Sequence, residues 1–218
     1  MEFPGSGRTL ARGRVQALVM VRPTVIFDLG GVLVSVDFAR ACARLAAAGG
    51  VPTAVILEAI AEGEDKAGFD TGRLSPPEFA ERFCAALGLR LPYAEFADIW
   101  CDIFAEQREV TGLLDEIGRH ADLLLLSNTD PLHFDYLRRR YGFLARFRQQ
   151  LLSYEVGHAK PERQIFERAL AACALGSRLI YFDDVAEYVA AARACGLPAE
   201  QFVGAAKLRL ALGKFGAL

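Results

Sequence analysis

The segment between residues 21 and 36 contains the apolar run TVIFDLGGVLVSV, which limits the possible folds more than any other part of the chain. Its first residues are mostly β-branched or aromatic and do not alternate with polar ones, as expected of a strand covered on both faces. Runs of the same kind follow at 122–126, 150–153 and 178–182, with a weaker one at 201–203. Helical patterns separate these runs, at 109–119, 131–141, 161–173 and 186–195. This alternation predicts an α/β fold with a Rossmann-like parallel sheet and right-handed crossovers.

About 70 residues without a strand pattern separate the first strand from the second. They hold four amphipathic patterns, at 37–48, at 52–61, from Ser75 onward and at 93–106. Asp37 and Ser75 occupy N-cap positions, and Ser75-Pro76-Pro77-Glu78 forms a capping box with proline at the first helical position. Four such helices can bury their apolar faces in a small bundle. We therefore predict a disordered N-terminal extension at 1–20, an α/β core at 21–36 and 109–218, and an inserted α-helical cap at 37–108.

The composition excludes several classes of partner. A formal net charge of −2 with 24% charged residues predicts neither a nucleic-acid-binding surface nor a polybasic membrane patch. No apolar run reaches the roughly 18 residues that a membrane span needs. The five cysteines are an odd number without C-x-x-C spacing, which is typical of reduced and mostly buried thiols, so we predict a cytoplasmic protein. The sequence predicts no particular oligomeric state.

Polar residues follow the predicted strands at the points where those strands end. They are Asp28, the triplet Ser127-Asn128-Thr129, Lys160 and the pair Asp183-Asp184. Ligands of doubly wound folds bind outside the carboxyl ends of the strands, so we expect these side chains to converge. Carboxylates that lie close together repel one another unless a cation joins them, and hard oxygen ligands select Mg²⁺. A lysine and a hydroxyl beside Mg²⁺ suit a phosphate group.

These motifs resemble those of the haloacid dehalogenase (HAD) superfamily of hydrolases, in particular its phosphatases with a helical cap inserted after the first strand. FDLGGVL, SNT, the lysine of GHAKPE and FDDVAEYVAAARACG match its four motifs in order, over roughly residues 24–203. Within the superfamily, the forms DLGxV, SNT and FDD are similar to those of the group that includes sugar-1-phosphate phosphatases. The resemblance implies a small phosphorylated metabolite as the substrate and Mg²⁺ as the cofactor.

The resemblance also implies a role for each matched residue. Asp28 would attack phosphorus and form an aspartyl-phosphate, which water then hydrolyses. Ser127 and Lys160 would complete the catalytic set by contacting the phosphoryl group and offsetting its charge. The phosphate would also be bound at Leu29, Asn128 and Thr129. The ligands of Mg²⁺ would be Asp28, the carbonyl of Gly30, Asp183 and Asp184.

Two positions depart from the family pattern and keep alternatives open. Gly30 stands where the phosphatases usually have a second aspartate that protonates the leaving group, and Tyr188 stands where aspartate or asparagine is usual. A catalytically weak or inactive HAD-like binding protein is therefore one alternative. A 2-haloacid dehalogenase, which needs no such acid, is another. However, no arginine lies between Arg44 and Arg73 to bind the halide, and the paired carboxylates after the fourth strand indicate a metal.

Three further residues lie near the predicted site in the sequence. Asp37 follows the nucleophile by nine positions and could replace the missing acid, although a helix N-cap is the simpler interpretation. His133 is interpreted as a peripheral residue, with a substrate contact as the alternative. Trp100 is interpreted as part of the core of the helical bundle.

Overall fold

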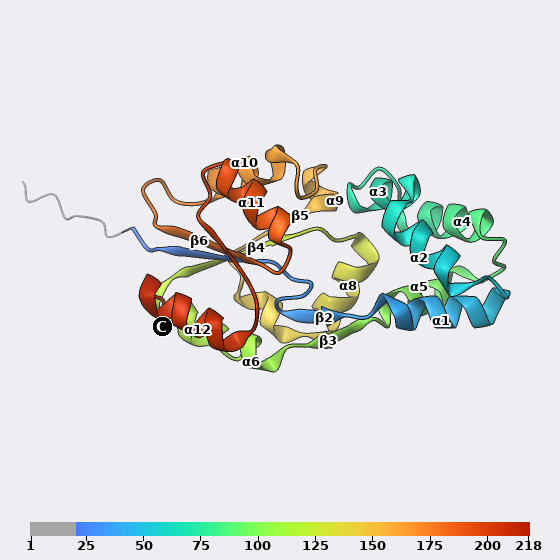
Figure 1. Cartoon of the computed structure of the whole chain (residues 1–218), viewed down its shortest axis with the longest axis horizontal. Helices are drawn as coiled ribbons and strands as arrows, with labels where there is room; N and C mark the ends of the chain where they lie inside the picture. The colour runs from blue at the N-terminus through green and yellow to red at the C-terminus, as the bar shows by residue number, and fades with distance from the viewer. Residues whose placement is uncertain (1–20) are drawn as a thin grey trace, which may run out of the picture.

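The computed structural model describes residues 21–218, and these form two regions joined along the long axis of the molecule (Figure 1). The larger region holds a five-stranded parallel sheet with the strand order β5-β4-β1-β6-β7. Its strands are β1 (Thr24–Phe27), β4 (Asp122–Ser127), β5 (Gln149–Leu152), β6 (Leu179–Asp183) and β7 (Ala199–Gln201). The predicted α/β class and Rossmann-like parallel sheet are therefore confirmed. The predicted extension at 1–20 lies outside the described residues.

Strand β1 lies at the centre of the sheet and pairs with β4 on one side and β6 on the other. Because successive side chains point to opposite faces, Val25 and Phe27 pack into one apolar cluster and Ile26 packs into another. Both clusters are buried, which explains why this strand does not alternate between apolar and polar residues.

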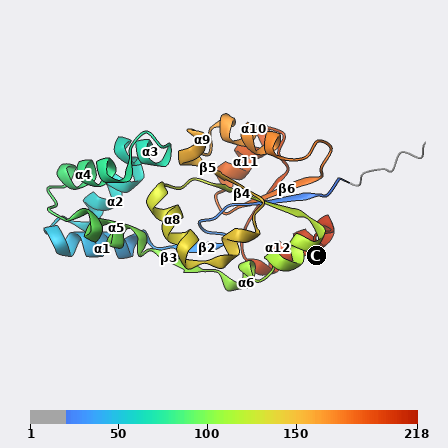
Figure 2. The ribbon, with the colours of Figure 1, turned by 180° about the vertical axis from the view of Figure 1, so that it is seen from behind.

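Helices cover both faces of the sheet (Figures 1 and 2). On the face of Ile26 lie α10 (Arg163–Ala172) and α11 (Ala186–Ala194). On the other face lie α7 (Leu114–His120), α8 (Pro131–Arg140) and α12 (Ala205–Phe215). Short elements complete this region, namely α6 (Arg108–Thr111), the 3₁₀ helix η1 (Gly142–Arg146) and α9 (Ser153–Val156).

The smaller region is a helical insert with an apolar cluster of its own, and we call it the cap. Its helices are α1 (Phe38–Gly49), α2 (Thr53–Glu62), α3 (Glu64–Asp70), α4 (Pro76–Ala86) and α5 (Tyr93–Cys101). Asp37 accepts a hydrogen bond from the backbone N–H of Arg40 at 3.2 Å and so caps α1. Ser75 and Glu78 form the expected capping box of α4. Trp100 is fully buried among the cap aromatics, in agreement with its interpretation as bundle core.

Several element boundaries differ from the sequence prediction. The helix predicted at 93–106 ends at Cys101, and Phe104–Glu106 form strand β3, which pairs antiparallel with β2 (Val34–Val36). A local sequence pattern does not contain a pairing between two segments about 70 residues apart. The apolar residues after Cys101 continue the pattern of α5, so the sequence wrongly predicts that the helix continues to residue 106. The helix predicted at 109–119 is divided into α6 and α7 at Gly112 and Leu113. Helices α3 and α12 were not predicted.

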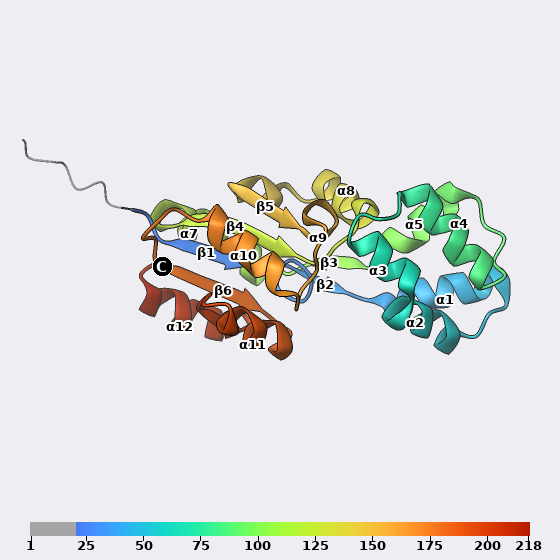
Figure 3. The same ribbon diagram turned by 90° about the horizontal axis from the view of Figure 1, so that it is seen from above.

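The cap lies beyond the carboxyl ends of the parallel strands, and the β2–β3 ribbon connects it to the core (Figures 1 and 3). Helix α3 of the cap contacts helix α9 of the core. Gly72 follows α3 with φ +73°, and a Cβ at this position would overlap the carbonyl oxygen of Tyr154. The approach of cap and core at this point therefore requires glycine. Among residues 21–218, no helix is long and apolar enough to cross a membrane.

Candidate active site

The residues that follow the central strands meet at one edge of the sheet. Asp28 comes directly after β1, Ser127 ends β4 and Asp183 ends β6, with Asp184 next to it. Because β1 lies between β4 and β6, the parallel register places these positions side by side. Asp28, Asp183 and Asp184 each offer a carboxylate oxygen, and these oxygens lie within 4.8 Å of one another. The structure therefore brings the three predicted carboxylates together.

Lys160 reaches this cluster from the loop between α9 and α10. Its Nζ atom lies 2.9 Å from Asp28 Oδ2 and 2.7 Å from Asp183 Oδ2, and its side chain is 1% exposed. Burial alone would lower the pKa of Lys160, but the charges of Asp28 and Asp183 and their hydrogen bonds raise it above its ordinary value. The ammonium group therefore stays protonated and supplies one positive charge to the carboxylate cluster.

Asp28 is buried, and its carboxylate is held from two sides. Oδ1 accepts a hydrogen bond from the backbone N–H of Leu29 at 2.6 Å, while Oδ2 faces Lys160. Burial raises the pKa of Asp28 to about 7, with the charge of Asp183 adding to the rise and Lys160 opposing it. Three carboxylates against one ammonium leave a formal charge of −2, which a divalent cation would balance.

The surroundings of the three carboxylates fit a hard cation such as Mg²⁺, which takes oxygen ligands. Asp184 packs directly over Gly31, where a Cβ would overlap its carboxylate, so glycine is needed for the acid to sit at this edge. Asp183 is held in place because its Oδ1 accepts a hydrogen bond from the backbone N–H of Val185 at 2.9 Å. The carbonyl of Gly30 as a fourth ligand remains a proposal.

The residues of the triplet Ser127-Asn128-Thr129 make contacts of their own beside the roles that the resemblance implies. Asn128 donates from Nδ2 to the carbonyl oxygen of Lys160 at 2.8 Å, and its Oδ1 accepts from the N–H of Lys160 at 2.7 Å. This side chain therefore fixes the backbone that carries the lysine. The N–H of Thr129 donates to the hydroxyl of Ser153 at 2.9 Å. Among the described residues, the hydroxyl of Ser127 at the edge of the sheet donates a hydrogen bond only to the carbonyl oxygen of Asn128, at 3.3 Å.

Two tyrosines lie next to Lys160, namely Tyr188, which the sequence marks as a departure from the family pattern, and Tyr181, which it does not mark. The buried hydroxyl of Tyr181 accepts a hydrogen bond from Lys160 Nζ at 3.1 Å and donates to Asp183. Tyr181 precedes Asp183 by two positions in β6, so the alternation of a strand could have placed both on one side. The ring of Tyr188 lies 5.1 Å from Lys160 Nζ, within the range of a cation–π contact. Where the family pattern usually has aspartate or asparagine, Tyr188 therefore presents an aromatic ring to Lys160.

A cavity of about 610 Å³ lies between cap and core and reaches Lys160. From the cap, its lining includes Lys66, Asp70, Thr71 and Arg73; from the core, it includes His158, Lys160 and Tyr188. His158 is tied to the wall because Nδ1 lies 2.6 Å from Glu162 Oε2. The cavity therefore combines cationic, anionic and aromatic groups, and it opens onto the lysine that contacts Asp28.

Comparisons with known proteins agree with this fold. A sequence model of haloacid dehalogenase-like hydrolases matches residues 23–196. A HAD family enzyme of Bacteroides thetaiotaomicron, solved with magnesium and inorganic phosphate, is 22% identical with a TM-score of 0.73, covering 83% of this chain and 93% of its own. A predicted HAD-like hydrolase of Porphyromonas gingivalis is 25% identical with a TM-score of 0.72, at 83% and 91% coverage. The L-2-haloacid dehalogenase of Xanthobacter autotrophicus is 16% identical with a TM-score of 0.59, at 83% and 76% coverage.

Proposed function

Because the chain belongs to the haloacid dehalogenase-like hydrolases, we propose that it is a Mg²⁺-dependent phosphatase of small phosphate monoesters with Asp28 as its nucleophile. One observation carries this proposal. Three carboxylates whose oxygens lie within 4.8 Å of one another face a single buried lysine. Their excess negative charge suits a divalent cation, and a cation next to a lysine suits a phosphoryl group.

The residues of the cluster divide the work of such a reaction. An oxygen of Asp28 would attack phosphorus and the ester oxygen would leave, giving an aspartyl-phosphate that water later hydrolyses. Lys160 would offset negative charge on the phosphoryl oxygens, and Ser127 would donate a hydrogen bond to one of them. Asn128 would keep Lys160 in place through its two backbone hydrogen bonds. A bound Mg²⁺, held by Asp28, Asp183 and Asp184, would supply further charge neutralisation.

The departing oxygen finds no acid at the usual place, because Gly30 has no side chain. The carboxylate of Asp37, the alternative acid, is instead the N-cap of helix α1. Esters whose leaving group departs readily as an anion therefore suffer least, which favours sugar 1-phosphates, aryl phosphates and acyl phosphates over sugar 6-phosphates. We propose that the leaving group occupies the cavity between cap and core, where Lys66, Asp70 and Arg73 of the cap face it.

The proposal is tested by measuring kcat/KM for p-nitrophenyl phosphate, acetyl phosphate, glucose 1-phosphate and glucose 6-phosphate with Mg²⁺ and with EDTA. Wild type should require the metal, and Asp28→Asn should lose activity although it retains its fold. Asp135→Asn, at an exposed position of α8, is the matched control and should behave as wild type. Full activity in EDTA or in Asp28→Asn would refute this mechanism.

The same assays separate the two alternatives. A 2-haloacid dehalogenase would release chloride from 2-chloropropionate without a metal, whereas the carboxylate cluster favours the metal-dependent reaction. A binding protein without catalysis would turn over no ester, yet Mg²⁺ with beryllofluoride would still raise its melting temperature.

A further inference from the structure

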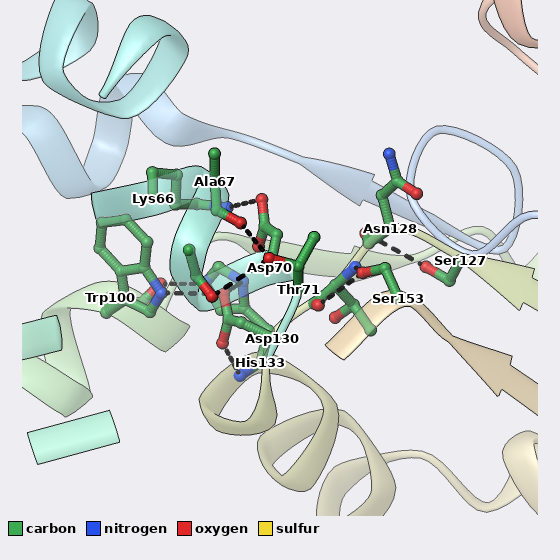
Figure 4. Close-up of polar contacts among 12 residues, drawn as sticks. Lys66, Ala67, Asp70, Thr71, Trp100, Ser127, Asn128, Asp130, His133 and Ser153 are labelled. Atoms are coloured by element: carbon green, nitrogen blue, oxygen red, sulfur yellow. Dashed lines mark hydrogen bonds and ion pairs between the residues drawn. The ribbon is translucent and has the colours of Figure 1, made fainter. Parts of the chain in front are cut away.

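A polar cluster joins the cap to the core at a point that the sequence motifs leave unassigned. It consists of Trp100 on cap helix α5 and of Asp130 and His133 at the start of core helix α8 (Figure 4). All three residues are buried. We call these three residues the cap–core latch.

Asp130 is the centre of the latch. Its Oδ1 accepts a hydrogen bond from the backbone N–H of His133 at 2.9 Å, which caps α8. Its Oδ2 accepts from Trp100 Nε1 at 3.3 Å and lies 2.8 Å from His133 Nδ1. Burial would raise the pKa of Asp130, but the charge and hydrogen bonds of His133 hold it below its ordinary value. One carboxylate therefore ends the core loop and binds the cap at the same time.

His133 binds the cap a second time. Its Nε2 lies 2.9 Å from the carbonyl oxygen of Trp100, and its ring stacks on the indole with centroids 5.3 Å apart and an interplanar angle of 1°. Both ring nitrogens thus face acceptors, a carboxylate on one side and a carbonyl on the other. The rings of His133 and Phe104 also meet edge to face, with centroids 4.9 Å apart. A core residue is therefore packed among aromatic residues of the cap and of the ribbon that connects it to the core.

The latch is continuous with the active site on the core side. Asp130 directly follows the triplet Ser127-Asn128-Thr129. The backbone N–H of Thr129 donates to the hydroxyl of Ser153, and the carbonyl oxygen of Thr129 accepts from that hydroxyl. Asn128, the middle residue of the triplet, holds Lys160. A displacement of Asp130 would therefore move the loop that positions both the serine and the lysine.

The latch is also next to the cap residues that line the cavity. Lys66 of α3 lies 2.5 Å from Asp70 Oδ2 and 5.9 Å from the ring centroid of Trp100. The other oxygen of Asp70 is buried and, among the described residues, has no hydrogen-bond partner. Opening the latch would thus shift the wall of the cavity together with α5.

We propose that Asp130 and His133 are positioning residues, which hold the cap closed over the active site by binding Trp100. The kinetic part of this inference rests on the proposed function, but the structural part does not. If the latch fails, the competent closed state becomes a minor population, and apparent substrate affinity falls in proportion to that population. The chemical step of the closed complex would change much less.

The structural part is tested by fluorescence, because Trp100 is the single tryptophan of the chain. Asp130→Asn keeps a good N-cap residue but removes the charge that His133 and Trp100 share. His133→Asn removes the stacked ring. Both variants should shift the emission to longer wavelength and raise the acrylamide quenching constant without any substrate. The controls Asp135→Asn and His120→Asn change exposed residues of the same types and should match wild type. Unchanged emission and quenching in folded Asp130→Asn and His133→Asn overturn the proposal.

The kinetic part is tested with p-nitrophenyl phosphate and Mg²⁺. The latch variants should raise KM about tenfold if the closed population drops to about one tenth, with kcat changed far less. A loss of kcat with an unchanged KM would instead indicate a purely structural role and would overturn the proposal. Trp100→Phe, which lacks the Nε1–H donor and keeps an aromatic ring, should raise KM likewise and serves if the buried charge variants fail to fold. If wild type has no phosphatase activity, the proposed function fails and fluorescence alone decides on the latch.

Discussion

Replacing Lys160 with methionine tests whether this lysine balances the charge of the carboxylate cluster. Among the described residues, Lys160 is the only cation within 4.0 Å of Asp28 or Asp183. Methionine fills a similar volume without charge, so the variant isolates the electrostatic contribution. The cluster then holds three carboxylates and no cation in the absence of a metal.

The size of the effect follows from the two ion pairs. At 2.9 and 2.7 Å, each pair is worth at most about 6 kcal/mol with an effective dielectric constant of about 20. Removing one partner of a buried pair costs about 3–5 kcal/mol in practice, because protonation and relaxation relieve part of the strain. For a chain of this length, that predicts a melting temperature lower by roughly 6–20 °C in EDTA.

The loss should depend on pH with a defined sign. In wild type the pKa of Asp28 is raised to about 7, chiefly by burial, and Lys160 opposes the rise, so removing Lys160 raises this pKa further. A protonated Asp28 fits the buried cluster below the unfolded pKa of about 4, and this stability is lost as the pH rises toward the raised folded-state pKa. The variant should therefore be nearly as stable as wild type at low pH and more strongly destabilised at pH 8.

Thermal denaturation at pH 5 and pH 8, with EDTA and with Mg²⁺, measures this effect. Mg²⁺ should stabilise Lys160→Met more than wild type at pH 8, because it meets one more uncompensated negative charge. Lys207→Met, at an exposed position of α12, is the control and should melt as wild type does. A variant that melts as wild type does at pH 8 in EDTA would show that Lys160 does not balance these acids.

Three further predictions concern the metal, the cap and the leaving group. Asp28 must be deprotonated to bind a metal, and its pKa is raised to about 7, chiefly by burial. The rise in melting temperature caused by Mg²⁺ should therefore grow between pH 6 and 8. A rise that is the same at every pH contradicts this. Gly72→Ala should destabilise the protein by about 1–3 kcal/mol and raise KM, since its φ is +73° and its Cβ would overlap Tyr154; an unchanged melting temperature contradicts this. Gly30→Asp should raise kcat/KM for glucose 6-phosphate relative to glucose 1-phosphate, by at most about 10²–10⁴. The new Cβ would lie 3.3 Å from Val36 Cγ2, a tight contact that the valine side chain can relieve. An equal gain on both sugars contradicts the prediction.

The parallel sheet could be predicted because burial on both faces leaves a direct mark on the sequence. Val25, Ile26 and Phe27 face two different apolar clusters, so none of them can be polar. The β2–β3 ribbon leaves no such mark. Val34–Val36 and Phe104–Glu106 are three-residue strands whose hydrogen bonds join segments far apart in the chain, and a local pattern does not contain that pairing.

The candidate site was predictable to the extent that topology alone determines it. A residue that ends a central parallel strand must lie at the ligand-binding edge, and this holds for Asp28, Ser127 and Asp183 whatever their neighbours are. The role of each side chain depends instead on which partner it meets after folding. Tyr181 has no motif, yet its hydroxyl lies between Lys160 and Asp183.

Asn128 illustrates how a motif residue can have a structural role beside its predicted one. The resemblance implies that the backbone near Asn128 helps to bind the phosphate, and the side-chain amide also binds the carbonyl and the N–H of Lys160, 32 positions away in the chain. The second and third motifs are thereby joined by two hydrogen bonds. Those bonds fix the backbone from which the ammonium group reaches Asp28. A leucine at position 128 would supply neither this donor nor this acceptor. The identity of the residue therefore records a contact between loops, which only the folded chain makes visible.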